Sequence, residues 1–357
     1  MNIAILGAGN AGSSVAADLT LKGHTVSLIK TTDSMHNENY NYLINNKKIK
    51  LIDNNNIQEV TIDTVSKDLS LIRKSDVIIV YIQTNYHEAL IKRIKPYLRD
   101  DHILILNPGY LSTAYVLKHC SNIDLTIVEA QSSFIDCRIK EPGTVKISFR
   151  NARNPLGIYP QHKKEQTIKK LDLIGYPFEY LTSVIDAGLH NPNLIVHTVG
   201  AIMSVPRIEK TEGEYYMYRE VFTPSVWNIV EALDHEKMNV MERLGSKRVP
   251  YLQACKYRNT LDDSRDAKEV FEWYAQMPNP IKGPTQVDSR YITEDVPQGL
   301  VLLESLGRYY GIKTPVTSSL INIANAALQD DFRQNARTIN SLTKKSLDLI
   351  LEDRKSG

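Results

Sequence analysis

The histidine at position 197 is the side chain of this sequence best suited to acid–base chemistry. An imidazole with an ordinary pKa near ~6.5 can accept or donate a proton at neutral pH. Asn193 precedes His197 by four residues, so the two side chains share one face if this segment is a helix. From the spacing alone, a histidine that is hydrogen-bonded within the core is the commoner alternative to a catalytic one.

Charged and polar residues at two other places could bind a ligand. Arg290 lies five residues before Asp295, which in turn precedes Pro297 at the expected start of a helix. Asp295 could therefore simply interact with the dipole of that helix. Glu129 and Gln131 follow a short apolar run, and ligands of doubly wound folds bind where the parallel strands end. A structural turn is the alternative for these two residues.

A glycine-rich loop near the N-terminus predicts a dinucleotide site. Gly7, Gly9 and Gly12 follow a short apolar run, with Asn10 and Ala11 between the last two, and precede a helical segment from Ser13 to Leu21. The first glycine permits a tight turn, the second lets a pyrophosphate approach the backbone, and the third lets the helix pack closely on the strand. The first N–H groups of the helix can then bind the phosphates. A glycine turn without a ligand is the alternative.

The end of the second predicted strand bears on the choice of coenzyme. An acidic residue at this place binds the ribose 2′-hydroxyl of NAD, but here the strand ends in Lys30, followed by two threonines. A lysine can pair with the 2′-phosphate of NADP. We therefore expect NADP, with NAD possible if Lys30 is only a charge beside the site.

These motifs require elements that can position them, and the sequence predicts two domains in an α/β chain. Residues 1–182 read as a Rossmann domain with a doubly wound, mostly parallel sheet, within which the polar stretch 37–56 is expected to be irregular or partly antiparallel. Residues 183–357 read as an all-helical substrate and catalytic domain. Its predicted helices include 297–310, 315–328 and 332–350.

Composition excludes several classes of function. The chain of 357 residues has 43 Lys and Arg against 41 Asp and Glu, a net charge of +2 without long runs of one sign, which argues against binding nucleic acid or acidic membranes. It has no apolar stretch long enough to span a membrane and no signal-peptide pattern at its start. Its three dispersed cysteines predict neither disulfides nor a metal site and suit a cytoplasmic protein.

Several segments along nearly the whole chain resemble the octopine/nopaline (opine) dehydrogenase family. The most specific are the stretch Asn191–His197, similar to the family's NxxxH helix start, and Arg290–Leu300, similar to its RyxxEDVPxGL signature. Supporting segments are the glycine loop, Tyr86-His87 with Asn107-Pro108-Gly109, Glu129–Arg138, Arg207–Glu209, Tyr218–Ser225 and Ala232–Glu236. Gln298 departs from the family where an aromatic residue is common, and residues 251–280 match poorly, so substrate specificity is expected to differ there.

The resemblance implies an NAD(P)-dependent oxidoreductase that joins the amino group of an amino acid to the carbonyl carbon of an α-keto acid and reduces the resulting imine. It implies that His197 is the acid/base and that Asp295 orients its ring, as in the logic of catalytic triads. Arg290 would hold the keto-acid carboxylate by paired hydrogen bonds, with a surface ion pair as the alternative. Asn193, Glu129 and Gln131 would contact substrate.

Two other functions fit the same features. One is a ketopantoate- or 2-hydroxy-acid-type NADP reductase of the same fold, which would need no amino acid. The other is a dinucleotide-binding sensor without turnover, although a sensor has no use for an acid/base pair. Amino acid and keto acid are the expected small-molecule partners, and a homodimer is possible.

Overall fold

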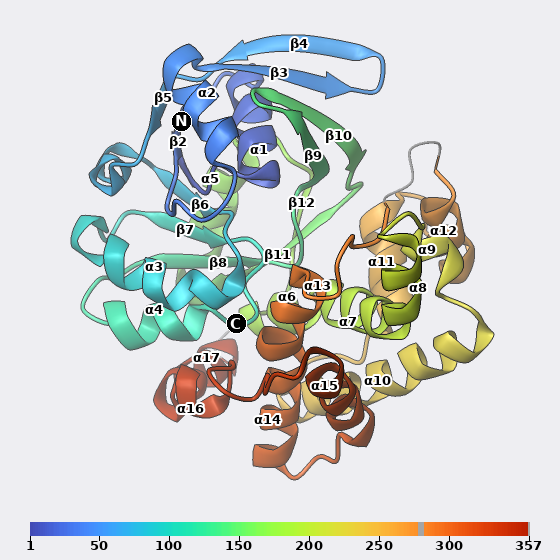
Figure 1. Ribbon diagram of the computed structural model, residues 1–357. Helices are drawn as coiled ribbons and strands as arrows, with labels where there is room; N and C mark the ends of the chain where they lie inside the picture. Colours follow the sequence, from blue (N-terminus) through green and yellow to red (C-terminus); the bar gives the residue numbers. More distant parts are fainter. Residues whose placement is uncertain (278–281, 356–357) are drawn as a thin grey trace. The chain divides into compact units, whose positions relative to one another are not determined.

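The computed structural model describes residues 1–277 and 282–355, and the chain divides into two compact units (Figure 1). The first comprises Met1–Ala187 together with the C-terminal residues from Glu352 onward, and the second comprises Gly188–Leu351. The boundary expected after residue 182 lies just before helix α6 (Val184–Leu189), and the division between the units falls within that helix.

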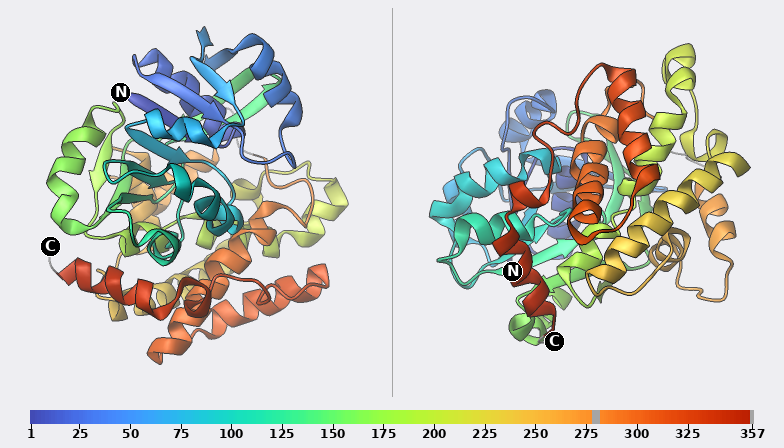
Figure 2. Two further views of the ribbon diagram at one scale, coloured as in Figure 1. Left: turned by 90° about the vertical axis from the view of Figure 1, so that its left-hand side faces the viewer. Right: turned by 90° about the horizontal axis from the view of Figure 1, so that it is seen from below.

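An eight-stranded sheet forms the centre of the first unit, and Figure 2 shows it from two further directions. Its strands from β8 to β5 are parallel, whereas β11 runs antiparallel to β8 and parallel to β12. The central strands β1, β6 and β7 are buried at nearly every residue, as is typical of parallel strands covered on both faces. In spatial order the strands are β12 (Phe178–Tyr180), β11 (Asn154–Tyr159), β8 (Thr126–Ala130), β7 (Ile103–Leu106), β6 (Val77–Val80), β1 (Asn2–Leu6), β2 (Thr25–Ile29) and β5 (Thr64–Ser66).

A second sheet of four strands covers helix α1 (Asn10–Leu21) from the other side, so that α1 packs against both sheets (Figure 1). Its order is β4 (Asn56–Thr61), β3 (Lys48–Asp53), β10 (Thr144–Arg150) and β9 (Ile135–Glu141). Arg150 of β10 links helix α1 to the four-stranded sheet, because it donates hydrogen bonds to Asp18 of α1 and to Asp53 of β3, each at 2.7 Å. Both faces of α1 are thus fixed by protein contacts.

The remaining helices of the first unit connect or flank these strands. They are α2 (Asn37–Asn46), α3 (His87–Ile94), α4 (Thr113–Cys120) and α5 (Lys164–Asp172), with short 3₁₀ turns at Leu69–Lys74, Thr84–Tyr86, Lys95–Tyr97 and Gln161–Lys163. The polar stretch 37–56 was expected to be irregular or partly antiparallel. It consists of α2, of β3 and of the first residue of β4, with which β3 pairs antiparallel, so its first half is regular helix.

In the second unit, the described residues form helices without strands, which are drawn from yellow-green to red in Figure 1. They are α7 (Asn193–Met203), α8 (Val205–Thr211), α9 (Met217–Glu220), α10 (Pro224–Arg243), α11 (Tyr251–Asn259), α12 (Ala267–Ala275), α13 (Arg290–Thr293), the π-helical turn η5 (Val296–Leu300), α14 (Val301–Tyr310), α15 (Pro315–Leu328), α16 (Ile339–Leu342) and α17 (Lys344–Lys355), whose last turn, from Glu352, belongs to the first unit.

The single helix predicted over 332–350 is wrong. Residues 332–335 form a turn, with Asn335 in the left-handed region at φ 57°, and Thr338 caps the short helix α16 through a hydrogen bond from the N–H of Ser341. Thr343, at φ 70°, then separates α16 from α17. A β-branched residue at positive φ is unusual, and the apolar spacing of the segment gives no sign of it.

Two further observations concern residues 1–277 and 282–355. None of their helices combines the length and hydrophobicity that crossing a lipid bilayer requires. Nor do these residues gather three or more His, Cys, Asp or Glu side chains as a metal would need.

Candidate active site

His197 and Asp295 are hydrogen-bonded, although 98 residues separate them in the sequence. Nδ1 of His197 lies 2.8 Å from Oδ2 of Asp295, and the two side chains are 10% and 1% exposed. A carboxylate can only accept, so Nδ1 carries the hydrogen and the lone pair of the neutral ring lies on Nε2. The arrangement therefore holds the imidazole in the tautomer that accepts a proton at Nε2.

Local helix geometry places each partner of this pair. Asn191 accepts a hydrogen bond from the backbone N–H of Asn193 at 3.0 Å, which starts α7 and places His197 one turn into the helix. Asp295 lies between α13 and η5, at the N-terminal end of η5 and just before Pro297. The helix-dipole alternative for Asp295 is thus compatible with its bond to His197, because the same side chain lies at the start of η5 and accepts from Nδ1 of the ring.

Tyr291 is a third member of this cluster, and no sequence prediction included it. Its ring is stacked on the imidazole of His197, with centroids 3.7 Å apart and 6° between the planes. Tyr291 is buried at the start of α13, four residues before Asp295. One short segment therefore contacts the histidine ring on its edge and on its face. The aromatic position beside Arg290 in the family signature is the only signal that the sequence offers.

The other predicted residues of the helical unit lie on the same two segments. Arg290 begins α13, is 48% exposed, and has its Nε 3.5 Å from Oε2 of the buried Glu294. This contact is compatible with the ion-pair alternative. Asn193 is the first residue of α7, one turn before His197 and partly exposed. Contacts of Arg290 and Asn193 with substrate remain predictions.

Glu129 is completely buried at the end of β8 and binds backbone. Its carboxylate accepts hydrogen bonds from the N–H groups of Leu111 at 2.9 Å and Thr113 at 2.7 Å, at the start of α4. A Cβ on Gly109 would lie 2.2 Å from this carboxylate, so the turn requires glycine there. These contacts support the structural-turn alternative. Gln131 is also buried, and its Oε1 has no hydrogen-bond partner among the described residues.

The glycine loop has the geometry of a phosphate cradle. Gly7 adopts φ 122°, and a Cβ on Gly12 would lie 1.7 Å from the carbonyl oxygen of Gly7, so the helix meets the loop more closely than any side chain allows. The first turn of α1 contains Asn10 and Ala11. The side chain of Asn10 accepts from the N–H of Ile139 at 2.7 Å, which anchors the helix N-terminus to β9. The loop fits the pyrophosphate of a dinucleotide.

Basic residues gather beyond β2, beside this loop. Lys30 is buried and donates to the carbonyl oxygen of Met35, and burial lowers its pKa. Its ammonium and that of Lys67 lie 5.7 Å and 5.3 Å from the ring centroid of Tyr40. The imidazole of His36 stands where a Cβ on Gly9 would point, 3.1 Å away, and burial followed by the charge of Lys30 lowers its pKa. Two lysines and a histidine thus surround the expected position of the adenosine ribose.

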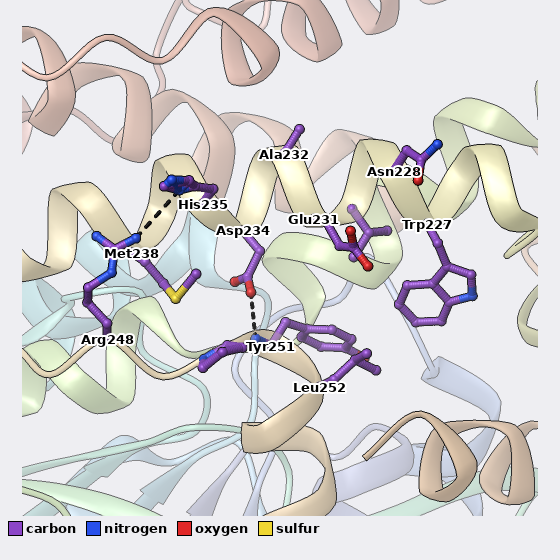
Figure 3. A pocket seen from close by; sticks show the side chains of 12 residues that line it. Trp227, Asn228, Glu231, Ala232, Asp234, His235, Met238, Arg248, Tyr251 and Leu252 are labelled. Carbon is purple, nitrogen blue, oxygen red and sulfur yellow. Dashed lines mark hydrogen bonds between the residues drawn. The ribbon is translucent and has the colours of Figure 1, made fainter. Parts of the chain in front are cut away.

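A separate hollow of about 700 Å³ lies along α10 in the helical unit (Figure 3). Asp234 accepts from the N–H of Tyr251 at 2.6 Å, and a guanidinium nitrogen of Arg248 lies 3.5 Å from Nδ1 of His235. No residue predicted to bind substrate or coenzyme lines it, so this hollow is distinct from the residues around His197.

Comparisons with known proteins divide the chain in the same way as the motifs. Residues 180–328 match the family described as NAD/NADP octopine/nopaline dehydrogenase, alpha-helical domain, and residues 3–160 match ketopantoate reductase PanE/ApbA. An opine dehydrogenase of Arthrobacter sp. (strain 1C) is 26% identical over 351 residues, which cover 95% of this chain and 94% of that protein.

Two solved structures share the fold over nearly their whole length. Octopine dehydrogenase in complex with NADH and agmatine has a TM-score of 0.76 at 16% identity and covers 98% of both chains. Yersinopine dehydrogenase with bound NADP⁺ has a TM-score of 0.70 at 15% identity and covers 100% of this chain and 99% of its own. The similarity in fold thus extends across both units.

Proposed function

Because the chain belongs to the octopine/nopaline (opine) dehydrogenase family, we propose that it condenses an amino acid with an α-keto acid and reduces the imine to a secondary amine dicarboxylate, and that it also catalyses the reverse oxidation. It is an NAD(P)-dependent oxidoreductase of the type that acts on CH–NH donors. The observation that carries the proposal is the buried His197–Asp295 pair, within the region that matches the family's helical domain.

In this proposal, proton transfer is the task of His197. In the oxidative direction, neutral Nε2 accepts the proton of the secondary amine, and Asp295 stabilises the imidazolium that forms. In the reductive direction, the protonated ring donates that proton back or polarises the carbonyl. The bound nicotinamide supplies or receives the hydride. Asp295 also keeps the ring from turning, so that the same nitrogen serves both directions.

Substrate binding is assigned to polar groups near this pair and at the end of the sheet. Arg290 would bind the keto-acid carboxylate through its guanidinium, which suits two parallel hydrogen bonds. Asn193 lies on the face of α7 that carries His197 and would contact the substrate beside it. Gln131 would line the amino-donor pocket, and Glu129, whose carboxylate accepts from the N–H groups of Leu111 and Thr113, would line it only by holding that turn in place. The unpaired Oε1 of Gln131 favours a role in accepting a donor hydrogen bond, since a buried polar atom without a partner is costly.

For the coenzyme we propose a preference for NADPH, with NADH possible. Lys30 brings a positive charge to the end of β2, where NAD-selective proteins place an acid, and Lys67 lies beside it in an ion pair with Asp33 at 2.6 Å. Octopine dehydrogenase carries NADH and yersinopine dehydrogenase carries NADP⁺ in structures of this fold. The fold therefore accepts either coenzyme, and we expect the residues beyond β2 to determine which of the two binds more tightly.

A second candidate is a carbonyl reductase, because residues 3–160 match ketopantoate reductase. The two functions differ in their need for an amine. We would follow NADPH absorbance while screening amino acids against pyruvate and other keto acids, and repeat each reaction without the amino acid. Oxidation that requires the amine supports the opine reaction. Equal rates with and without amine would identify a carbonyl reductase, and no oxidation with any pair would favour a binding protein without turnover.

A further inference from the structure

The contact between Tyr291 and His197 has a geometry that depends on the charge of the histidine. The rings lie nearly face to face, at 3.7 Å between centroids and 6° between planes. Two neutral aromatic rings avoid this arrangement, because their negative faces repel, and they prefer offset or edge-to-face contacts. A protonated imidazole over the negative face of a phenol ring is instead attracted by it. The stack therefore suits the imidazolium better than the neutral ring.

We propose that Tyr291 is a positioning residue that, together with Asp295, holds the His197 ring and stabilises its protonated form. Asp295 fixes the ring edge through Nδ1, and Tyr291 fixes the ring plane. A ring held at one edge alone can still tilt about that hydrogen bond, whereas a ring also held at its face cannot. The catalytic consequence of this inference rests on the proposed function, whereas the contact between the rings of Tyr291 and His197 does not depend on it.

The surroundings of Tyr291 keep its ring in place. Tyr291 is 8% exposed, and the buried Tyr215 lies near it. Burial, above all, raises the pKa of Tyr215 to about 12, and its hydroxyl is hydrogen-bonded to Ser204 at 2.9 Å. Tyr215 is therefore neutral at physiological pH and adds no charge to the cluster.

Other charged groups on elements packed against α7 have their own partners. Four charged side chains are buried there, namely Asp234, Glu236 and Lys237 on α10 and Glu294 after α13. Asp234 and Lys237 pair with each other, Glu236 accepts from backbone N–H groups at the start of α15, and Glu294 lies near Arg290. The His197 ring itself is hydrogen-bonded to Asp295 and stacked on Tyr291.

The test compares wild type with Tyr291→Phe, Tyr291→Leu and Tyr291→Met. Phenylalanine keeps the aromatic face and removes only the hydroxyl, whereas leucine and methionine fill the space without an aromatic face; methionine replaces leucine if the latter variant does not fold. Circular dichroism and coenzyme affinity check the fold of each variant. The protonation of His197 is followed by NMR on protein labelled with ¹⁵N-histidine, and its signal among the nine histidines is identified by its loss in His197→Gln.

We expect Tyr291→Phe to titrate like wild type and Tyr291→Leu to titrate at a pH lower by roughly half a unit to one unit, as the loss of a cation–π contact predicts. The kcat of Tyr291→Leu should fall on the order of 10-fold, with KM and coenzyme affinity nearly unchanged. A purely structural Tyr291 would instead leave both the titration and the kcat of folded Tyr291→Leu at their wild-type values, which would overturn the proposal. A titration midpoint of His197 that rises in Tyr291→Leu would also overturn the proposal. Water that enters beside the ring raises the midpoint, whereas loss of the stack lowers it.

These readouts separate the two proposals. A wild type without amine-dependent oxidation of NADPH overturns the proposed function, while the NMR titration still decides whether Tyr291 stabilises the protonated ring. An active wild type with an unshifted Tyr291→Leu titration overturns the role of Tyr291 alone.

Discussion

Replacing Asp295 by asparagine tests the proposed mechanism most directly, because the substitution keeps the shape of the side chain and removes its charge. Asp295 is 1% exposed, and its oxygen lies 2.8 Å from Nδ1 of His197. Charge centres about 4 Å apart interact by about 4 kcal/mol at an effective dielectric constant of about 20. Water at the 10% exposed His197 side chain weakens this attraction. We therefore expect Asp295→Asn to lower kcat by about 10²- to 10³-fold.

The assay for this prediction is a double-mutant cycle with His197→Ala. Steady-state rates of amine-dependent NADPH oxidation and coenzyme dissociation constants would be measured for wild type, both single variants and the double variant. His197→Ala should lower turnover by ~10²- to 10⁴-fold and leave coenzyme affinity nearly unchanged, because the glycine loop belongs to the other unit. The double variant should be little worse than the worse single variant, since paired groups act as one.

Two results would refute this reasoning. Near-wild-type turnover in His197→Ala would show that another group transfers the proton. Strictly additive losses in the cycle would show that Asp295 and His197 act independently, and the hydrogen bond between them would then have no catalytic meaning.

Three further predictions follow from the first unit. Lys30→Asp should weaken NADPH binding by about 10- to 100-fold and NADH binding much less, because a carboxylate would face the 2′-phosphate; titrations of wild type with equal affinity for both coenzymes, or with a preference for NADH, would contradict it. Glu129→Ala should destabilise the fold by about 2–5 kcal/mol, because two buried backbone N–H groups lose their acceptor, whereas Glu129→Gln should cost less; equal urea midpoints for the two variants would contradict it. Desolvation by itself raises the pKa of Glu88, but hydrogen bonds from Lys118 and His119 outweigh it and lower that pKa to about 2. The stabilisation by Glu88 should therefore be complete above about pH 4.5 and be lost as the pH falls toward 2, so the difference in urea midpoint between wild type and Glu88→Gln should shrink from about pH 5 to about pH 3, and a constant difference over that range would exclude this origin.

Local patterns in the sequence were sufficient to predict the dinucleotide fold. A strand, a glycine loop and a helix lie within the first 21 residues, so the motif that indicates this fold is local in sequence. The pairing of His197 with Asp295 could not be predicted in this way, because their positions differ by 98 in the sequence and no periodicity connects α7 with η5. Only the family resemblance brought the two together.

Other features were missed for identifiable physical reasons. The stacking of Tyr291 depends on how α13 meets α7, and a buried tyrosine in sequence is indistinguishable from ordinary core. Glu129 was interpreted by its place at the end of a strand, but its backbone partners lie on a turn formed by Gly109 and the residues after it. The predicted helix over 332–350 failed because Thr343 adopts a left-handed φ that sequence patterns do not reveal.

The two layers around α1 have a consequence for the kinetics and thermodynamics of coenzyme exchange. With β2 on one side, β9 and β10 on the other, and Arg150 joining α1 to β3, the helix has little freedom to fray when its N-terminus carries no phosphate. The amide groups that would receive the pyrophosphate are thus oriented before the coenzyme arrives, and binding need not be accompanied by ordering of that helix. Amide hydrogens along α1 should then exchange with solvent about equally slowly in the apo and coenzyme-bound protein, and any protection gained on binding should concentrate in residues 30–36, beyond β2.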